Sequence, residues 1–304
     1  MPIMIDFSQT VVAAVCVSAK SGADITKQLS DEATAIVAMR NIVLNIIKSY
    51  KTKFGKTYGE IIICCDGPNI WRKKYFKYYK ANRKKGREES EINWELVFKC
   101  LDIMILELEN YFPYKVVKVQ GAEGDDVIAV LTRIHATTDE KILIISTDKD
   151  FRQLQVHKNV VQYAASQKKF LKEEDPVDYR FQLICDGDVS DGVPNIFSLE
   201  NAFVDKIRQT ASTAKRKEEV KPYFYKYFET GDLSVFESIE DKDLKNRILT
   251  NILMIDLMGN SVPEELRERI INTYKEAYVP PRKEILSYMI KFGLRNLIDH
   301  IGKF

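Results

Sequence analysis

The chain has 304 residues, 45% of them hydrophobic, which is enough to bury a sizeable core in one large domain or two smaller ones. The net charge is only +2, so total charge indicates no partner, although acidic clusters and basic runs fall in separate segments. Apolar runs too short for a bilayer and the lack of a signal-peptide pattern exclude a membrane or secreted protein and predict a cytoplasmic one.

Short runs rich in valine and isoleucine predict five strands, at 3–6, 60–66, 115–119, 141–146 and 159–164. Helical patterns fall between or after these strands, at 31–51, 69–80, 91–112, 123–136 and 149–156. Such alternation is typical of βαβ units, so we predict an α/β fold with a parallel twisted sheet and helices on both faces.

Beyond about residue 176 the strand pattern fades, and helices are predicted at 176–185, 198–230, 235–258, 263–277 and 282–301. Pro280 and Pro281 separate the last of these from the helix before it. We therefore predict an α/β domain at 1–180 and a helical region at 181–304. The highly charged stretch 81–92 is predicted to be a mobile connection rather than part of the core.

The cysteines and histidines give no indication of a zinc site or a disulfide framework. The five cysteines lie mostly in apolar sequence without a CxxC pair, so we expect reduced thiols. The three histidines do not recur near the acidic residues described next, and we interpret them as structural or surface residues.

Three apolar strands run directly into an aspartate: Asp6, Asp66 and Asp148 follow IMI, IIICC and ILIIST. In a parallel sheet, ligands bind at the carboxyl ends of the strands, so these carboxylates are expected in one small volume. Crowded carboxylates resist ionisation unless a cation neutralises them. The strand ends therefore predict a divalent metal site.

Other acidic residues lie in GAEGDD, which opens a predicted helix, in STDKDF, which contains Asp148, and in the glycine-containing loop DGDVSDGVP. Each segment alone has a simpler explanation, since acids favour helix N-termini and turns. The convergence of five segments on one edge favours a shared metal centre. Its further candidate ligands are Glu123, Asp125, Asp126, Asp150, Asp188 and Asp191.

Carboxylates without accompanying histidine point to hard cations, Mg²⁺ with Mn²⁺ as a substitute, rather than to zinc. The number of carboxylates exceeds what one ion needs, and two ions about 3.5–4 Å apart are the arrangement that uses so many. Such a pair activates water and stabilises the attacking and leaving oxygens at a phosphate. The predicted reaction is phosphodiester hydrolysis, with no histidine needed as the base.

Residues 71–90, WRKKYFKYYKANRKKGREES, combine basic and aromatic side chains. A helix here would place lysines on one stripe and aromatic residues on another face, and the lysines could be merely solvated. Because the segment follows the strand that ends at Asp66, we favour a phosphate backbone that bridges its cations and the metal site. The candidate nucleic-acid-binding residues are Arg72, Lys73, Lys77, Lys84, Lys85 and Arg87, beside Lys80 and Arg83.

These motifs resemble the 5′ nuclease, or flap endonuclease, family, most closely the RNase H-type 5′-to-3′ exonucleases of T-even-like bacteriophages. The resemblance runs along nearly the whole chain and rests on MIDFSQ, ICCDGPNIWRKKYFKYYKANR, AEGDDVIAVL, LIISTDKDF, GDVSDGVPN and PPRKEILSYMIKFGL. It implies a PIN-like catalytic domain with a parallel sheet flanked by helices. It also implies a helical C-terminal DNA-binding domain with a degenerate helix–turn–helix.

The resemblance implies a role for each acidic residue. Those that resemble ligands of a first metal ion are Asp6, Asp66, Asp125 and Asp148, with Glu123 nearby and the role of Asp126 left open. Those that resemble the group around a second ion, reached partly through water, are Asp150, Asp188 and Asp191.

In the basic segment, Tyr79, Lys80 and Arg83 match a family pattern in which a base stacks and cations meet the scissile phosphate. Stretch 81–92 resembles the arch that guides single-stranded 5′ ends. The chain departs from the family after GDVSD, where the paired-glycine hairpin that grips duplex DNA and binds potassium is missing. A potassium site is therefore in doubt.

The implied activity is Mg²⁺-dependent hydrolysis at the 5′ ends of RNA in RNA–DNA hybrids, of duplex DNA and of 5′ flaps, which would remove RNA primers during phage DNA replication. We expect a monomer. The C-terminal NLIDHIGKF would either dock a sliding clamp or a single-stranded DNA-binding protein, or close the core as an amphipathic helix. The alternatives are a catalytically silent flap-binding module, for which no ligand is missing, and an aspartate-based phosphotransfer domain, which leaves the basic segment unexplained.

Overall fold

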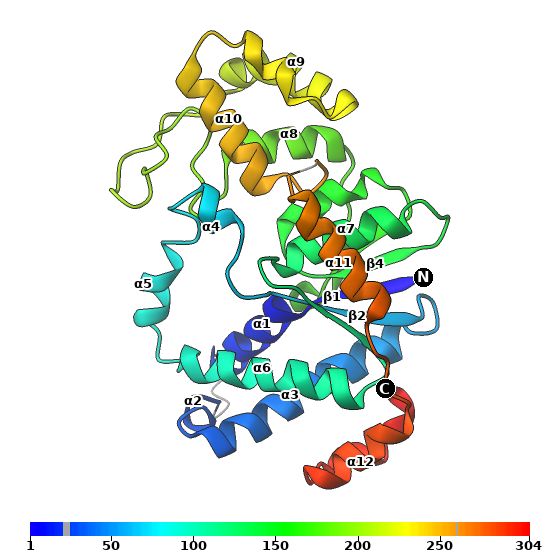
Figure 1. Cartoon of the computed structure of the whole chain (residues 1–304). Helices are drawn as coiled ribbons and strands as arrows, with labels where there is room; N and C mark the ends of the chain where they lie inside the picture. Colours follow the sequence, from blue (N-terminus) through cyan, green and yellow to red (C-terminus); the bar gives the residue numbers. More distant parts are fainter. Residues whose placement is uncertain (21–24, 260) are drawn as a thin grey trace.

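The computed structural model describes residues 1–20, 25–259 and 261–304, and its centre is a six-stranded sheet in the order β3-β2-β1-β4-β5-β6 (Figure 1). Strands β1 to β5 are parallel, as predicted, and β6 pairs antiparallel with β5. The sequence pattern did not predict β6. The strands are β1 (Pro2–Asp6), β2 (Glu60–Cys65), β3 (Lys115–Lys118), β4 (Ile142–Ile145), β5 (Val160–Ala164) and β6 (Lys169–Leu171).

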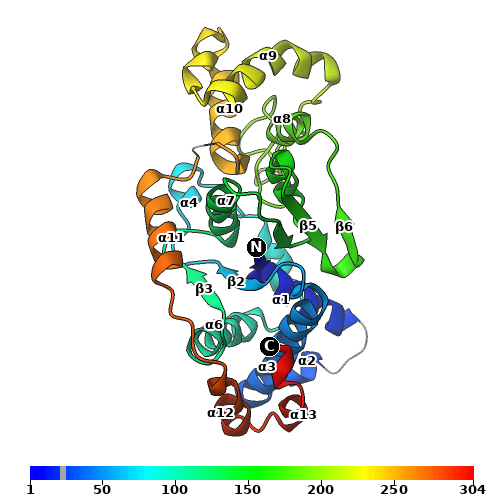
Figure 2. The same cartoon turned by 90° about the vertical axis from the view of Figure 1, so that its right-hand side faces the viewer.

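The central strands are apolar throughout because both faces of the sheet are covered. In β1, Ile3 and Ile5 belong to one buried cluster and Met4 to another, as the alternation of side chains along a strand requires. Figure 2 shows the helical layers on the two sides. One layer contains α1 (Phe7–Lys20), α3 (Glu32–Phe54), α6 (Trp94–Tyr111) and α12 (Lys283–Lys291), and the other contains α7 (Gly124–His135), the 3-10 helix η1 (Lys149–Val156) and α11 (Glu264–Glu276).

A third buried cluster lies in the helices at the top of Figure 1 and contains Phe181, Phe224 and Phe236. The predicted helix 198–230 begins only at residue 214, where the Thr213 side chain accepts a hydrogen bond from the Arg216 N–H. Residues 199–213 form turns and irregular structure. The elements of this region are α8 (Pro176–Asp186), α9 (Ala214–Thr230), the 3-10 helix η3 (Leu233–Ser238) and α10 (Lys242–Ile255).

The prediction of one basic helix across 69–80 is wrong. Helix α4 spans only Arg72–Tyr75, after which Phe76 is extended and Lys80 has a left-handed backbone with φ 57°. Phe76 and Tyr79 are buried in the third cluster, and this tertiary packing overrides the local helical preference. The predicted lysine stripe therefore does not exist.

The stretch 81–92 was predicted to be a connection outside the core, and its side chains are mostly exposed. It nevertheless contains a short helix, α5 (Arg83–Glu88), which stands away from the sheet between α4 and α6 (Figure 1). The segment thus forms an arch-like bridge between the upper and lower helices.

The C-terminal segment returns to the α/β core. The predicted helix 282–301 divides at Gly293, whose φ is 67°, into α12 and the short α13 (Arg295–Ile298). Leu297 and Phe304 are buried in the same cluster as the sheet, which favours the core-closing interpretation of this segment.

Among the described residues, no helix is long and apolar enough to cross a membrane. The domain boundary near residue 180 stays a prediction.

A buried ion pair connects this C-terminal segment to the helices beneath the sheet. The Arg40 guanidinium of α3 donates to Glu107 of α6 at distances of 2.6 to 3.2 Å, and the Tyr288 hydroxyl of α12 donates to the same carboxylate at 2.6 Å. The three side chains come from separate regions of the sequence. Each depends on the others to satisfy a buried charge or hydroxyl.

Replacing Glu107 with Ala leaves the Arg40 guanidinium buried without a counter-charge, so we expect the free energy of unfolding to fall by about 3–5 kcal/mol. Urea denaturation followed by circular dichroism measures the loss. Glu32→Ala is the matched control, because the Glu32–Lys99 pair also joins α3 to α6 but is exposed. It should change the free energy of unfolding far less, and equal losses would contradict the argument.

Candidate metal centre and substrate-binding surface

The strand order places the acidic strand ends beside one another. Strand β1 lies between β2 and β4, so the chain reverses its direction of travel across the sheet at β1. In parallel α/β sheets, ligands bind outside the carboxyl ends of the strands at such a switch point. Asp6 ends β1, Asp66 follows β2, and Asp148 follows β4. The edge predicted from the sequence is therefore present.

Asp6 and Asp66 both face the start of helix α7. The Gly124 N–H donates to Asp66 Oδ1 at 2.7 Å. A Cβ atom placed on Gly124 would lie 3.5 Å from Asp66 Oδ1 and 3.8 Å from Asp6 Oδ1. The two carboxylates thus approach the same point, and glycine leaves that space open.

Asp148 and Asp150 lie at the start of η1. The Asp150 N–H donates to Asp148 Oδ1 at 2.9 Å, which caps this helix. Asp150 Oδ1 is buried and receives no hydrogen bond from the described residues. A buried carboxylate oxygen without a donor is costly, and a cation is the partner that would satisfy it.

Mutual repulsion is visible in the pKa values of these carboxyl groups. Burial, Asp66 and Asp148 together raise the pKa of Asp6 to about 7 from its ordinary value of 3.8. Burial and the charge of Asp6 raise the pKa of Asp125 well above its usual range. Burial and the charge of Asp148 do the same for the pKa of Asp150. These groups share one electrostatic environment.

The loop after α8 supplies two more acids. Asp188 Oδ1 accepts hydrogen bonds from the Ser190 and Asp191 N–H groups at 2.6 and 3.1 Å, and Lys149 Nζ lies 2.8 Å from Asp188 Oδ2. The charges of Asp188 and Asp191 help to raise the pKa of Asp150, after its burial and Asp148. We call the converging set the acidic cluster; it consists of Asp6, Asp66, Asp125, Asp148, Asp150, Asp188 and Asp191.

Glu123 differs from the acidic cluster because cations surround it. Lys80 Nζ lies 2.5 Å from its Oε1, and Arg72 Nη1 lies 2.9 Å from its Oε2. Burial alone would raise the pKa of Glu123, but Lys80 and Arg72 hold it below its ordinary value. Glu123 therefore stays ionised beside the cluster.

Arg72 and Asp126 form an internal brace rather than a binding surface. Arg72 is only 2% exposed; its Nη1 lies 2.8 Å from Asp126 Oδ1, and its Nε donates to the Met254 carbonyl. Asp126 Oδ2 also accepts from the Trp71 indole at 3.0 Å. This pairing favours neither the predicted contact of Arg72 with nucleic acid nor the predicted role of Asp126 as a metal ligand, and both stay predictions.

The three residues of the predicted phosphate-binding pattern lie against the acids. The Tyr79 ring is 3% exposed, and its hydroxyl lies 2.8 Å from Glu123 and 2.9 Å from Asp191, so it cannot stack on a base in this structure. The ring packs in the third cluster here, and its stacking on a base stays a prediction. Arg83 Nη2 lies 2.5 Å from Asp191 Oδ1, and Lys80 Nζ lies 3.7 Å from its Oδ2.

A cationic cavity opens between α4, α5 and α6. Its volume is about 520 Å³, and its lining includes Lys73, Lys80, Arg83 and Arg87. Lys77 is exposed and lines a neighbouring cavity. The side chains of Lys84 and Lys85, predicted to bind nucleic acid, lie outside the described residues. Positive charge is thus gathered next to the acidic cluster without a continuous helix.

The acidic cluster fits hard divalent cations in the chemistry of its donors. Oxygen ligands alone, the open space at Gly124 and the unpaired Asp150 Oδ1 are what Mg²⁺ or Mn²⁺ would use. Within the described ranges, no three of the acidic, cysteine or histidine side chains already surround a common metal position. Lys80, Arg83 and Lys149 supply the positive charge among the carboxylates here. The assignment of individual ligands stays a prediction.

The sequence patterns missed the polar residues that support the acidic cluster. Ser146 is 1% exposed and donates to Asp6, and Gln162 is fully buried in β5 beneath the loop that carries Asp148. A glutamine inside the apolar strand VVQYA was a usable signal, because buried amides are retained where they have partners.

Comparison with known proteins places the chain in a family. Residues 5–182 match the N-terminal resolvase-like domain of 5′-3′ exonucleases, and residues 176–304 match the C-terminal domain of T4 RNase H. Ribonuclease H of Enterobacteria phage T4 is 30% identical over 308 residues, covering 99% of this chain and 95% of that protein. A 5′-3′ exonuclease of Buchnera aphidicola is 30% identical over 179 residues, covering 53% of this chain and 55% of that protein.

The chain therefore belongs to the 5′-3′ exonuclease and flap endonuclease family of hydrolases, with phage T4 ribonuclease H as a relative along almost its whole length. This confirms the family expected from the motifs.

Solved structures show the same fold. A phage T5 protein co-crystallised with metal ions has a TM-score of 0.58 at 16% identity, covering 91% of this chain and 98% of that one. A phage T5 flap endonuclease solved with DNA and metal ions has a TM-score of 0.56 at 14% identity, covering 90% and 99%. At these identities the likeness shows the fold alone, a mostly parallel α/β sheet with a helical C-terminal region.

In metal-free buffer, the stability of the protein should depend on the ionisation of Asp6. The unfolded chain loses this proton near pH 3.8 and the folded chain near pH 7, so the free energy of unfolding should fall as pH rises between these values. Asp6→Asn removes the repulsion and should flatten this decline, leaving the variant more stable than the parent above pH 7.

Urea denaturation in EDTA at pH 5, 6, 7 and 8 measures the effect. Asp102→Asn is the control, because Asp102 is an exposed acid that pairs with Lys118 and does not belong to the cluster. A parallel decline in the parent and in Asp6→Asn would contradict the assignment.

Proposed function

We propose that this protein is a Mg²⁺-dependent 5′-to-3′ nuclease that hydrolyses phosphodiesters at the 5′ ends of RNA in RNA–DNA hybrids, of duplex DNA and of 5′ flaps. The observation that carries the proposal is the contact between the acidic cluster and the cationic cavity, made through Lys80 and Arg83. A nucleic acid presents the matching pattern, since its phosphates need cations on one side and metal ions on the other.

Two divalent ions in the acidic cluster would activate a water and stabilise the oxygens of the scissile phosphate. The carboxylates would hold them, with Asp6, Asp66 and Asp148 at the strand ends and Asp125 at the start of α7. The sequence likeness to phage T4 ribonuclease H along almost the whole chain supports this assignment of activity.

Lys80 and Arg83 are placed to bind the phosphate next to the cleaved bond. Burial disfavours the charge on Lys80, but Asp191 and Glu123 hold its pKa above the ordinary value, so it stays cationic at neutral pH. Arg83 has 40% of its side chain exposed on the side of the cavity. A phosphate oxygen could replace Asp191 as its partner because both are anionic acceptors.

The arch-like position of α5 suits the passage of a single-stranded 5′ end. The lining of the cavity that α5 covers includes basic side chains and Trp94, a mixture that accommodates phosphates and bases.

We include in the proposal that the protein removes RNA primers in phage replication and acts in the cytoplasm of the infected bacterium. We also include contact with a sliding clamp or single-stranded DNA-binding protein, and action as a monomer.

The direct test compares 5′-labelled RNA–DNA hybrid, nicked duplex and 5′ flap substrates in Mg²⁺, in Mn²⁺ and in EDTA. Products should be released from the 5′ end with either metal and not with the chelator. A blocked or 3′-labelled strand distinguishes the direction. Cleavage that persists in EDTA, or that begins at the 3′ end, would refute the proposal.

Asp125→Asn and Asp148→Asn should abolish cleavage while DNA binding is retained, because each removes one anionic ligand without removing volume. Gel shifts in Ca²⁺ and single-turnover cleavage in Mg²⁺ separate the two properties. Asp102→Asn, outside the cluster, should cleave like the parent. Full cleavage by both Asp125 and Asp148 variants would remove the basis for the metal assignment.

The double variant Lys80→Ala with Arg83→Ala should cleave at least 10-fold more slowly and show a weaker dependence of binding on salt, because phosphate contacts release counter-ions. Fluorescence anisotropy across a range of KCl concentrations measures the slope. Lys172→Ala is the control. Lys172 is an exposed cation paired with Glu174, and it is far from Lys80 and Arg83 in the sequence. An unchanged slope in the double variant would show that these side chains serve only the internal ion pairs.

A further inference from the structure

The hydroxyl of Ser146 joins two strand-end aspartates directly. Ser146 Oγ donates to Asp6 Oδ2 at 2.8 Å and accepts a hydrogen bond from the Asp148 N–H at 3.0 Å. Asp6 ends β1 and Asp148 lies in the loop after β4, so one side chain fixes the distance between neighbouring strand ends.

Gln162 holds the same loop from below. Its side chain is fully buried in β5, paired in register with Ile144 of β4. Its amide Nε2 donates to the Ser146 carbonyl at 3.0 Å and to the Asp148 carbonyl at 2.6 Å. The amide Oε1 makes no hydrogen bond to the described residues, so the side chain is kept buried at a cost. The hydrogen bonds to the two carbonyls offset this cost.

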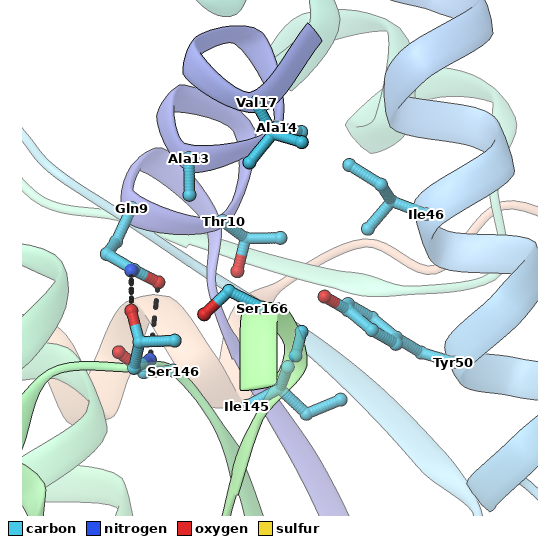
Figure 3. A pocket seen from close by; sticks show the side chains of 12 residues that line it. Gln9, Thr10, Ala13, Ala14, Val17, Ile46, Tyr50, Ile145, Ser146 and Ser166 are labelled. Atoms are coloured by element: carbon cyan, nitrogen blue, oxygen red, sulfur yellow. Dashed lines mark hydrogen bonds between the residues drawn. The ribbon is translucent and has the colours of Figure 1, made fainter. Parts of the chain in front are cut away.

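A cavity adjoins the loop on its other side. A cavity of about 200 Å³ lies between α1 and α3, and its lining includes Gln9, Ser146 and Thr147 (Figure 3). Gln9, labelled in Figure 3, reaches from α1 and exchanges hydrogen bonds with Thr147. Because an open cavity provides few van der Waals contacts, the loop depends on hydrogen bonds for its position.

We propose that Ser146 and Gln162, here called the positioning pair, set the separation of Asp6 and Asp148 and thereby the affinity of the acidic cluster for divalent metal. The proposal rests on the proposed metal-dependent function and adds two residues that do not themselves ligate. Loss of a group that orients a metal ligand typically lowers metal affinity by about 10- to 100-fold. Without the pair, like charges would move the carboxylates apart.

The test measures Mn²⁺ binding to the whole chain without nucleic acid, by isothermal titration calorimetry. Ser146→Ala and Gln162→Met should weaken Mn²⁺ binding by about 10- to 100-fold. Ser146→Thr keeps the hydroxyl, and its added methyl group has room in the cavity, so it should bind within about threefold of the parent. Ser166→Ala is the matched control, because Ser166 lines the same cavity but makes no hydrogen bond to the acidic cluster among the described residues.

Two further readouts separate positioning from general stability. Hydrogen–deuterium exchange in EDTA should rise at residues 146–150 in Ser146→Ala while the helices retain their protection. In cleavage assays the Mg²⁺ concentration for half-maximal rate should increase, and the rate should recover at saturating Mg²⁺. If Gln162→Met does not fold, Ser146→Ala and its threonine counterpart still decide the question.

Parent-like Mn²⁺ affinity in a folded Ser146→Ala protein would overturn the proposal, as would an equal loss in Ser166→Ala. If the parent itself neither binds Mn²⁺ nor cleaves nucleic acid, the proposed function fails along with the positioning pair. If the parent binds and cleaves while the variants are unaffected, only the positioning pair fails.

Discussion

Repulsion among carboxylates at one edge of the sheet is the constraint around which the surrounding chain is organised. Seven acidic groups from five segments converge there, and burial together with like charge raises the pKa values of Asp6, Asp125 and Asp150. Such a cluster exists only if other parts of the protein hold it. The parallel sheet fixes the strand ends, α7 presents its first N–H to Asp66, and buried cations neutralise Glu123.

The fold of the basic segment brings its cations to these carboxylates. A regular helix from residue 69 would have placed its lysines in solvent. Instead, Phe76 and Tyr79 are buried in the third cluster, and the backbone turns at Lys80, whose N–H donates to the Asp191 carbonyl at 2.7 Å. Cations of the segment thereby reach the acids. A surface that binds phosphate and a site that would hold metal become parts of one structure.

The sequence was sufficient for whatever depends on local pattern. Apolar runs predicted the five parallel strands, and an aspartate after each of three strands predicted the acidic edge because strand ends in a parallel sheet coincide. The paths of 69–80 and 198–213 were not predictable, since tertiary burial decides them. Arg72 resembled its exposed neighbours in the sequence, and only the fold shows it paired with Glu123 and Asp126. Gln162 stands out in the sequence as a polar residue in an apolar strand. Its hydrogen-bond partners, the Ser146 and Asp148 carbonyls, lie elsewhere in the chain, and only the fold identifies them.

The Arg40–Glu107–Tyr288 contact has a consequence for the order in which parts of the protein fold during synthesis. Helix α12 and the residues after it complete the core that also contains β1, β2 and β4. On the ribosome, α3 and α6 emerge long before residue 288, so Glu107 can pair with Arg40 first and accepts from the Tyr288 hydroxyl only after α12 has been made. Such late, long-range contacts slow folding and postpone it. The layer beneath the acidic edge therefore closes only after α12 and the buried residues that follow it have been synthesised.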